Sequence, residues 1–212
     1  MEDEKSEGFG PKTSSVAKGQ IAYFQGEPGD SWYEVVSGFM MLCHFFGDGR
    51  RQIFRFAGPG DAFGFEIGQR QSSAEALTDA KVIRHPLVEI DRRQEYERFS
   101  GSHPALQRAL RAVEETIQLF SYGHADERIV AFLLKFGEHA DQPDLIELPM
   151  SRQDLADHLG LTMHTISRSI SELARRGFFV LEKPDRLRII DRAGMESLVQ
   201  FEGVEQHAQL VA

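Results

Sequence analysis

The first half of the chain alternates short apolar runs with turn residues. From Val16 to Ile90, segments rich in aromatic and aliphatic residues recur at intervals of roughly ten residues, which is typical of an antiparallel sandwich or barrel. The turn residues between them are Gly, Pro and Asp, as in Gly47-Asp48-Gly49 and Pro59-Gly60-Asp61. We therefore expect a β-barrel over residues 15–100. Residues 1–14 are polar without periodicity, so we expect them to form a disordered arm.

Helical spacing replaces this pattern after Asp91. Pro104 suits the first turn of a helix. A stripe of apolar residues then follows at steps of four and three: Leu106, Leu110, Val113, Ile117 and Phe120. Two apolar positions per heptad are typical of a coiled-coil seam, so residues 101–123 are expected to form a dimerisation helix. The alternative is that the stripe packs against the barrel of the same chain.

A second helix is expected from Ala125 to Phe136, where apolar residues again recur at helical spacing. The proline-containing segment EHADQPDL then predicts a linker. Residues 124–147 are accordingly interpreted as a hinge helix and linker, and residues 148–212 as a second domain.

Two helices joined by a tight turn are predicted between Ser151 and Gly177. Ser151 and Asp154 suit a helix N-terminus, Gly160 supplies the positive φ of an interhelical turn, and Thr162 can cap the next helix. Such a helix pair is a helix-turn-helix. The expected inner faces are Leu155, Ala156 and Leu159 on the first helix, and Ile166, Ile170 and Leu173 on the second.

The outward side chains at the start of the second helix include His164, Ser167 and Arg168. The recognition helix of a helix-turn-helix places its N-terminal residues against base edges in the major groove. Arg168 can donate two hydrogen bonds to O6 and N7 of one guanine. The alternative for Arg168 is a surface arginine that pairs with Glu172 at i+4.

Beyond Gly177 the sequence FFVLEKPDRLRIID predicts a strand, a turn and a strand, which together would form a wing. Arg186 and Arg188 are candidates to contact DNA phosphates from it. Simple solvent exposure of both arginines is the alternative.

Composition narrows the choice of function. The chain has a net charge of −9, but six positive and three negative residues between Arg168 and Arg188 give this region a net charge of +3. No apolar run of about 18 residues and no signal peptide occur, so we expect a cytoplasmic protein without a membrane partner. The one cysteine, Cys43, excludes an internal disulfide and a cysteine-based metal or iron–sulfur site.

From about residue 16 to residue 200 the chain resembles the CRP/FNR family of bacterial regulators, and LPMSRQDLADHLGLTMHTISR is especially similar to its FixK-type branch. The resemblance implies an α+β protein with an N-terminal jelly-roll β-barrel like the cyclic-nucleotide-binding fold, a long dimerisation helix and a C-terminal winged helix-turn-helix. It also implies a homodimeric activator that binds double-stranded DNA at a palindromic, TTGAT-like site and recruits RNA polymerase.

The resemblance also assigns roles to individual residues. Ser167 and Arg168 match the end of the Glu-x-x-Ser-Arg pattern that contacts the half-site, while His164 replaces its glutamate. A carboxylate only accepts hydrogen bonds, whereas a neutral imidazole donates or accepts, so the preference at that base pair is expected to change. The positions that match backbone-contacting residues of the family are Ser151, Arg152, Gln153, Thr162 and Thr165.

No effector or cofactor is expected. In relatives that bind cyclic AMP, a Gly-Glu-Leu turn holds the ribose and an Arg-Ser pair holds the phosphate. Here Glu66 is out of step with that glutamate, and Arg70 is followed by Gln71, which disfavours a cyclic nucleotide as a partner. The N-terminal cysteine cluster of oxygen-sensing relatives is also missing.

Other functions remain as alternatives. Cys43 is interpreted as a core residue rather than a redox switch. His44 and His85 leave a haem-sensing or other sensor role open, but each lacks a second ligand at i+2 or i+4. A cupin-like metal enzyme would need a His-x-His pair, so we expect no metal and no catalytic site. A scaffold protein would leave the outward Ser167 and Arg168 unexplained.

Overall fold

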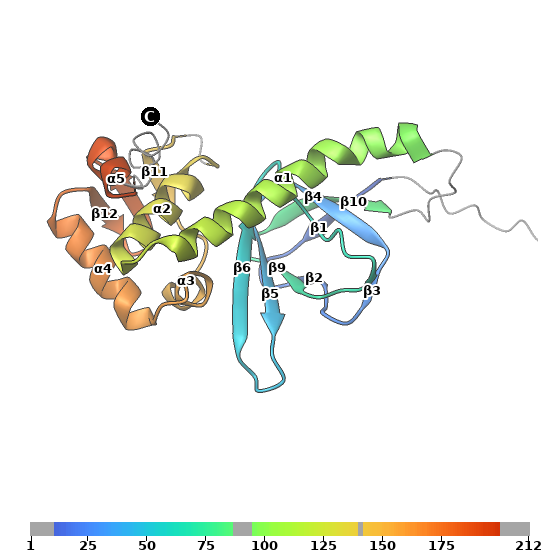
Figure 1. The fold of residues 1–212 in the computed structure, drawn as a ribbon, viewed down its shortest axis with the longest axis horizontal. Coiled ribbons are helices and arrows are strands. Elements are labelled where there is room, and N and C mark those ends of the chain that lie inside the picture. Colours follow the sequence, from blue (N-terminus) through green and yellow to red (C-terminus); the bar gives the residue numbers. More distant parts are fainter. Residues whose placement is uncertain (1–10, 87–94, 140–141, 200–212) are drawn as a thin grey trace, which may run out of the picture. The chain divides into compact units, whose positions relative to one another are not determined.

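The computed structural model describes residues 11–86, 95–139 and 142–199, with the side chains of residues 95–103 left out (Figure 1). The chain divides into two compact units between Thr116 and Ile117, within helix α1. The sequence between residues 1 and 10, most of the expected disordered arm, lies outside the described residues.

The first unit is a jelly roll of short antiparallel strands. Its two four-stranded sheets have the orders β1-β10-β4-β7 and β2-β9-β5-β6, and a two-stranded ribbon pairs β3 with β8. This confirms the predicted fold class of the N-terminal domain. The strands are β1 (Lys12–Val16), β2 (Ile21–Tyr23), β3 (Pro28–Gly29), β4 (Ser31–Ser37), β5 (Met40–Phe45), β6 (Arg51–Ala57), β7 (Ala62–Phe63), β8 (Gly68–Gln69), β9 (Ser73–Ala76) and β10 (Ala80–Pro86).

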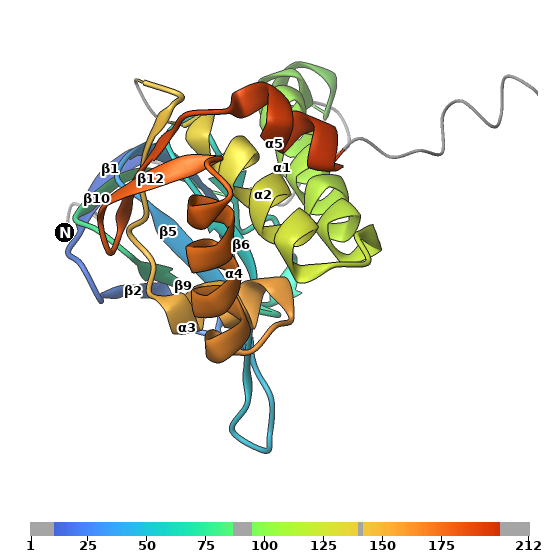
Figure 2. The same ribbon diagram turned by 90° about the vertical axis from the view of Figure 1, so that its left-hand side faces the viewer.

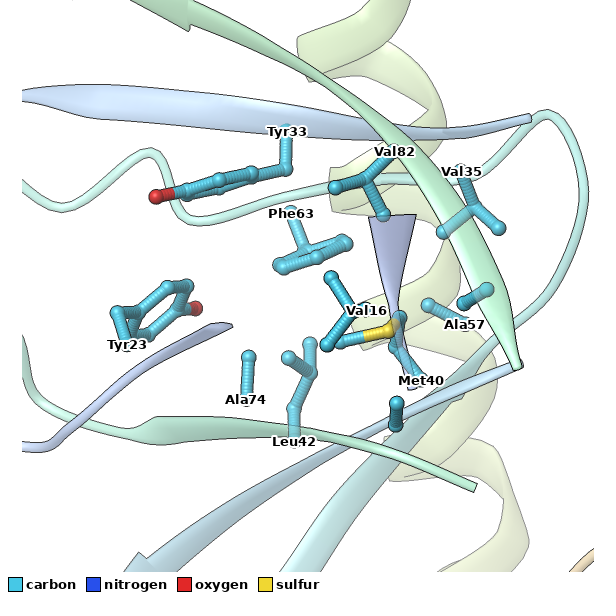
Figure 3. Close-up of a cluster of buried hydrophobic side chains, with 12 residues drawn as sticks. Val16, Tyr23, Tyr33, Val35, Met40, Leu42, Ala57, Phe63, Ala74 and Val82 are labelled. Atoms are coloured by element: carbon cyan, nitrogen blue, oxygen red, sulfur yellow. The ribbon is translucent and has the colours of Figure 1, made fainter. Parts of the chain in front are cut away.

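Side chains from both sheets fill the space between them (Figure 3). Tyr33 and Val82 come from one sheet and Met40 and Leu42 from the other, and the rings of Tyr33 and Phe63 stack at 5.4 Å. Burying such side chains contributes about 1.5–3 kcal/mol each, so this cluster is the main source of stability of the jelly roll.

Both predicted turns are present. Gly49 adopts φ +85° in the loop between β5 and β6, where Asp48 and Arg50 form an ion pair of 2.7 Å. Asp61 donates its backbone N–H to the Gly58 carbonyl in the turn between β6 and β7. The hairpin of β5 and β6 projects beyond the rest of its sheet (Figure 1).

The predicted boundary of the N-terminal arm is wrong. Residues Lys12 to Ser14, expected in the arm, form β1 and pair with β10, with Lys12 opposite Arg84 and Ser14 opposite Val82. The sequence of β1, KTSSV, does not alternate apolar and polar residues, so the strand was not predicted from it. Backbone pairing with β10 holds this segment in the sheet.

Helix α1 (Glu95–Ser121) is longer than predicted, and Pro104 lies in its interior rather than in its first turn. One face packs on the jelly roll: Ala105 is buried beside Trp32 and Ala62, and the Thr116 hydroxyl donates to the Phe54 carbonyl over 3.3 Å.

The apolar stripe of α1 lies on another face. Leu106 is half-buried, but Leu110, Val113, Ile117 and Phe120 are 57, 48, 62 and 45 % exposed. Leu110 and Val113, which lie in the first unit, are therefore not covered by the barrel of the same chain.

The second unit contains four further helices and a three-stranded sheet among the residues described. Sheet order is β11-β13-β12, so β12 and β13 form the predicted wing hairpin. The elements are α2 (Ala125–Gly137), β11 (Leu145–Glu147), α3 (Arg152–Leu159), α4 (Met163–Arg175), β12 (Phe179–Lys183), β13 (Arg186–Ile189) and α5 (Arg192–Val199).

The linker prediction is wrong at its C-terminal end. Leu145 to Glu147 form β11 and pair with β13, with Ile146 buried opposite Leu187. A three-residue strand is too short to show the alternation of apolar and polar residues that predicts a strand. This segment is a strand because its backbone pairs with β13, about 40 residues further along the chain. Helix α5, with Met195 buried, was not predicted from the sequence.

The first testable prediction concerns His85, whose ring stacks on Trp32 at 3.9 Å. Burial lowers the pKa of His85, and Glu34 only partly opposes this effect. The unfolded chain therefore binds more protons at mildly acidic pH. The free energy of unfolding that depends on neutral His85 is therefore complete above the ordinary histidine pKa of about 6.5. It decreases as the pH falls through the lower pKa of His85 in the folded protein.

Urea unfolding followed by the fluorescence of Trp32, the one tryptophan of the chain, measures this loss. His85→Phe keeps the stacked ring and removes the titration, so its free energy of unfolding should fall less than that of the wild type between pH 7.5 and pH 5.5. Equal losses in the two proteins would show that the titration of His85 does not contribute.

Candidate nucleic-acid interface

Helix α3 begins and ends as its sequence predicts. The Ser151 hydroxyl accepts from the Asp154 N–H over 3.1 Å, and the Asp154 carboxylate accepts from the Ser151 N–H over 2.9 Å. This reciprocal cap satisfies two backbone donors at the helix start. Gly160 ends the helix at φ +65°, a conformation that costs glycine little.

Helix α4 begins at a second polar cap. The Thr162 hydroxyl accepts from the Thr165 N–H over 3.1 Å, and the two threonine hydroxyls lie 2.8 Å apart. The six predicted inner residues are all buried, which confirms the predicted helix-turn-helix: Leu155, Ala156, Leu159, Ile166, Ile170 and Leu173. Figure 2 shows α3 and α4 next to each other.

The three predicted base-contacting residues lie on one exposed face of α4. His164, Ser167 and Arg168 are related by three and four residues, so they share one side of the helix. The side chain of Arg168 forms no hydrogen bond or ion pair with any part of the chain that the structure describes. Its guanidinium therefore keeps all of its donors for a ligand.

The structure shows no hydrogen bond or ion pair between Arg168 and Glu172. Glu172 accepts two hydrogen bonds from Arg175, over 2.6 and 3.0 Å, and these hydrogen bonds lower the pKa of the Glu172 carboxyl, an effect to which the positive charge of Arg168 also contributes. Glu172 is thus paired with Arg175 through both of its carboxylate oxygens.

The residues predicted to contact phosphates surround the starts of the two helices. The hydroxyls of Ser151 and Thr162 serve as caps, and Gln153 donates to Asp157 over 2.6 Å. The first turn of a helix also presents unpaired N–H groups that bind anions. The arrangement can therefore bind phosphate through backbone donors as well as through side chains.

Arg152 has a different environment from these neighbours. It is half-buried, and its Nη2 donates to the Pro184 carbonyl over 2.6 Å. Burial lowers the pKa of the Arg152 guanidinium, while the nearby Asp185 carboxylate opposes the shift. The side chain thus connects the start of α3 to the turn of the wing.

The wing arginines are both ion-paired. Arg186 lies 3.1 Å from Glu147 and 3.1 Å from Glu182, and Arg188 lies 2.7 Å from Glu182. Their contact with DNA phosphates stays a prediction. Lys183, at the end of β12, is exposed, and its ammonium has no hydrogen bond or ion pair to the described residues.

Arg128 is a positioning residue that the sequence analysis missed. It donates to the Tyr122 carbonyl over 3.0 Å and to the Leu159 carbonyl over 3.2 Å, and its guanidinium lies 5.9 Å from the centre of the Phe120 ring. The last carbonyls of a helix have no partner within the helix. The available signal was Arg128 as the one basic residue at the start of α2, directly after the acidic Asp126 and Glu127.

Arg70 of the jelly roll is committed to contacts within the protein. It is 2 % exposed, donates to the carbonyls of Gly64 and Ser31, and pairs with Glu66 at 3.2 Å. Its guanidinium also lies over the Tyr23 ring at 4.2 Å. A phosphate could bind Arg70 only after these contacts were broken.

The remaining sensor candidates of the jelly roll, Cys43, His44 and His85, are buried or half-buried. Cys43 is fully buried in β5, as expected for a core residue. His44 hydrogen-bonds the Gln71 carbonyl at 2.9 Å, and His85 lies on the other sheet against Trp32. The described residues include no group of three potential metal ligands and no helix able to span a membrane.

Comparison with known proteins agrees with this architecture. Residues 13–93 match the cyclic nucleotide-binding domain, and residues 127–198 match the Crp-like helix-turn-helix domain. The nitrogen fixation regulation protein FixK of Azorhizobium caulinodans is 38% identical over 180 residues, which are 78% of this chain and 70% of that protein. FixK of Rhizobium meliloti is 37% identical over 191 residues, covering 89% of this chain and 88% of that protein.

Solved structures show the same similarity. The structure of FixK2 from Bradyrhizobium japonicum aligns with a TM-score of 0.77 at 30% identity, covering 91% of this chain and 99% of that one. A CRP/FNR-family regulator from Thermus thermophilus aligns with a TM-score of 0.72 at 25% identity, covering 91% and 100%. The relatives are transcription regulators, and the chain belongs to the FixK-type branch of the CRP/FNR family of DNA-binding transcription regulators.

Proposed function

We propose that the protein is a homodimeric transcription activator that binds a palindromic, TTGAT-like site in cytoplasmic DNA and recruits RNA polymerase. The observation that supports this most directly is the unpaired Arg168 on the exposed N-terminal half of α4. Two recognition helices related by a two-fold axis contact half-sites about one helical turn apart, which accounts for a palindrome.

Base contacts are assigned to His164, Ser167 and Arg168, and backbone contacts to the helix starts that include Ser151, Gln153, Thr162 and Thr165. The net charge of −9 disfavours indiscriminate attraction to phosphates, while the region of net charge +3 between Arg168 and Arg188 favours docking through one face. Specificity then depends on a few base contacts.

Arg168→Ala should weaken binding to the palindrome by about 1–3 kcal/mol per half-site and relax the preference for guanine, because two hydrogen bonds to O6 and N7 are lost. Electrophoretic mobility shift titrations on the palindrome and on guanine-substituted sites measure both effects. Arg175→Ala is the matched control, since Arg175 is already paired with Glu172. A loss that is uniform over all sequences would assign Arg168 to a phosphate instead.

His164→Glu should shift the preference at the facing base pair toward that of the Glu-x-x-Ser-Arg pattern, because a carboxylate accepts from cytosine N4 and an imidazole need not. Selection from half-sites randomised at this pair measures the change. Ser171→Glu adds the same charge two turns further along α4 and should lower affinity without altering preference. An unchanged preference in His164→Glu contradicts the proposal for His164.

The dimer is proposed from the apolar stripe of α1. Four adjacent side chains between Leu110 and Phe120 are 45–62 % exposed in the single chain. Their steps of four and three suit knobs-into-holes packing against a second copy of the helix. Covering large apolar side chains in this way stabilises the pair of chains.

Ile117→Glu should convert the dimer into a monomer, because a two-fold axis brings the two new carboxylates close together on an apolar surface. Gln118→Glu adds the same charge at an exposed neighbour and should leave the dimer intact. Light scattering during size exclusion distinguishes the 24.0 kDa monomer from a species of twice that mass. A monomeric wild type, or a dimeric Ile117→Glu, would contradict this dimer.

No cyclic nucleotide is part of the proposed function. The guanidinium of Arg70 is already bound by two carbonyls and by Glu66, and Tyr23 covers one of its faces. An incoming phosphate would have to compete with all four groups. A haem- or redox-sensing regulator is a less favoured alternative, since Cys43 is buried and His44 and His85 are engaged elsewhere.

A further inference from the structure

The turn of the wing is hydrogen-bonded to the start of the helix-turn-helix. Arg152, the first residue of α3, donates to the Pro184 carbonyl over 2.6 Å, and the Leu148 N–H donates to the Asp185 carbonyl over 2.8 Å. Both acceptors belong to the two-residue connection between β12 and β13. The position of the wing turn is therefore fixed by the segment that leads into α3.

The guanidinium of Arg152 is directed into the protein. Its Nη1 has no contact with solvent and no hydrogen-bond partner among the described residues, and its Nη2 is bound to Pro184. A phosphate on the outer surface would find few free donors on this side chain. Arg152 is thus better suited to hold the wing than to bind DNA directly.

The wing itself presents one unpaired cation near this contact. Glu182 pairs with both Arg186 and Arg188, and Glu147 pairs with Arg186 as well. These carboxylates offset much of the positive charge of the two arginines. Lys183 adjoins the connection that Arg152 holds, and its exposed ammonium has no partner in the described part of the chain.

The first helix of a helix-turn-helix crosses the DNA backbone when the second enters the major groove. The start of α3 and the wing turn attached to it therefore belong to one backbone-facing surface. We propose that Arg152 is a positioning residue that holds the wing so that Lys183 contacts a DNA phosphate, an inference that rests on the proposed DNA binding.

The salt dependence of binding tests the role of Lys183. Each phosphate contact contributes about 0.9 to the slope of log K against log salt concentration, so Lys183→Met should reduce the slope of the dimer by about 1.8. Arg192→Met, a matched loss of one positive charge in the same unit at a residue already paired with Asp144, should leave the slope unchanged. A reduced slope in Arg192→Met with a normal slope in Lys183→Met would overturn the proposal.

Arg152 is tested by its coupling to Lys183. Arg152→Met should reduce the slope as much as Lys183→Met does, and combining the two substitutions should reduce it no further. Arg152→Lys keeps the charge but loses the forked donor, so its slope should also fall. If Arg152 binds phosphate itself, Arg152→Lys will keep the wild-type slope and the double variant will lose a further amount of about 1.8.

Two controls separate the possible failures. Thermal unfolding of each variant shows whether the second unit is still folded. If the wild-type protein shows no preference for the palindrome, the proposed function fails. If the preference is present and depends on Arg168 while Lys183→Met has the wild-type slope, only the proposal for Lys183 and Arg152 fails.

Discussion

The left-handed turn at Gly160 and the hydrogen bonds of Arg128 set the arrangement of the helices in the second unit. A Cβ atom at Gly160 would lie 3.2 Å from the Phe120 ring, so the end of α1 approaches the turn closely. Arg128 donates to the carbonyls of both Tyr122 and Leu159. Leaving such carbonyls buried without a donor costs about 1–3 kcal/mol each, which explains why one arginine joins the two helix ends. The start of α4 is thereby placed relative to the end of α1.

Charge pairing divides the cations of this unit into two groups. Arg175, Arg186 and Arg188 are bound by carboxylates from their own or a neighbouring element, and Arg152 is turned toward the wing. Arg168 and Lys183 have no such partner in the described residues. In an acidic protein this limits the electrostatic attraction to DNA and gives base contacts a larger share of the affinity.

The jelly roll keeps the fold of a cyclic nucleotide-binding domain, but Arg70, the arginine of the candidate phosphate site, is already bound by other groups of the protein. Arg70 is held by carbonyls and by Glu66, and its positive charge lies against Tyr23. Fold similarity alone does not imply ligand binding, because binding depends on which groups remain available. The same domain packs on α1 through contacts such as Ala105 with Trp32.

The sequence by itself determined the strand-rich first half, the apolar stripe of α1 and the whole of the helix-turn-helix from Ser151 to Gly177. These features depend on short-range periodicity, caps and glycine turns, which are written within a few consecutive residues. Only the tertiary structure decided the pairing of β1 and β11, the availability of Arg168, and the partners of Arg128 and Arg152. Each of these depends on groups from separate segments, and a local pattern contains no information about which distant carbonyl, carboxylate or strand will lie beside it.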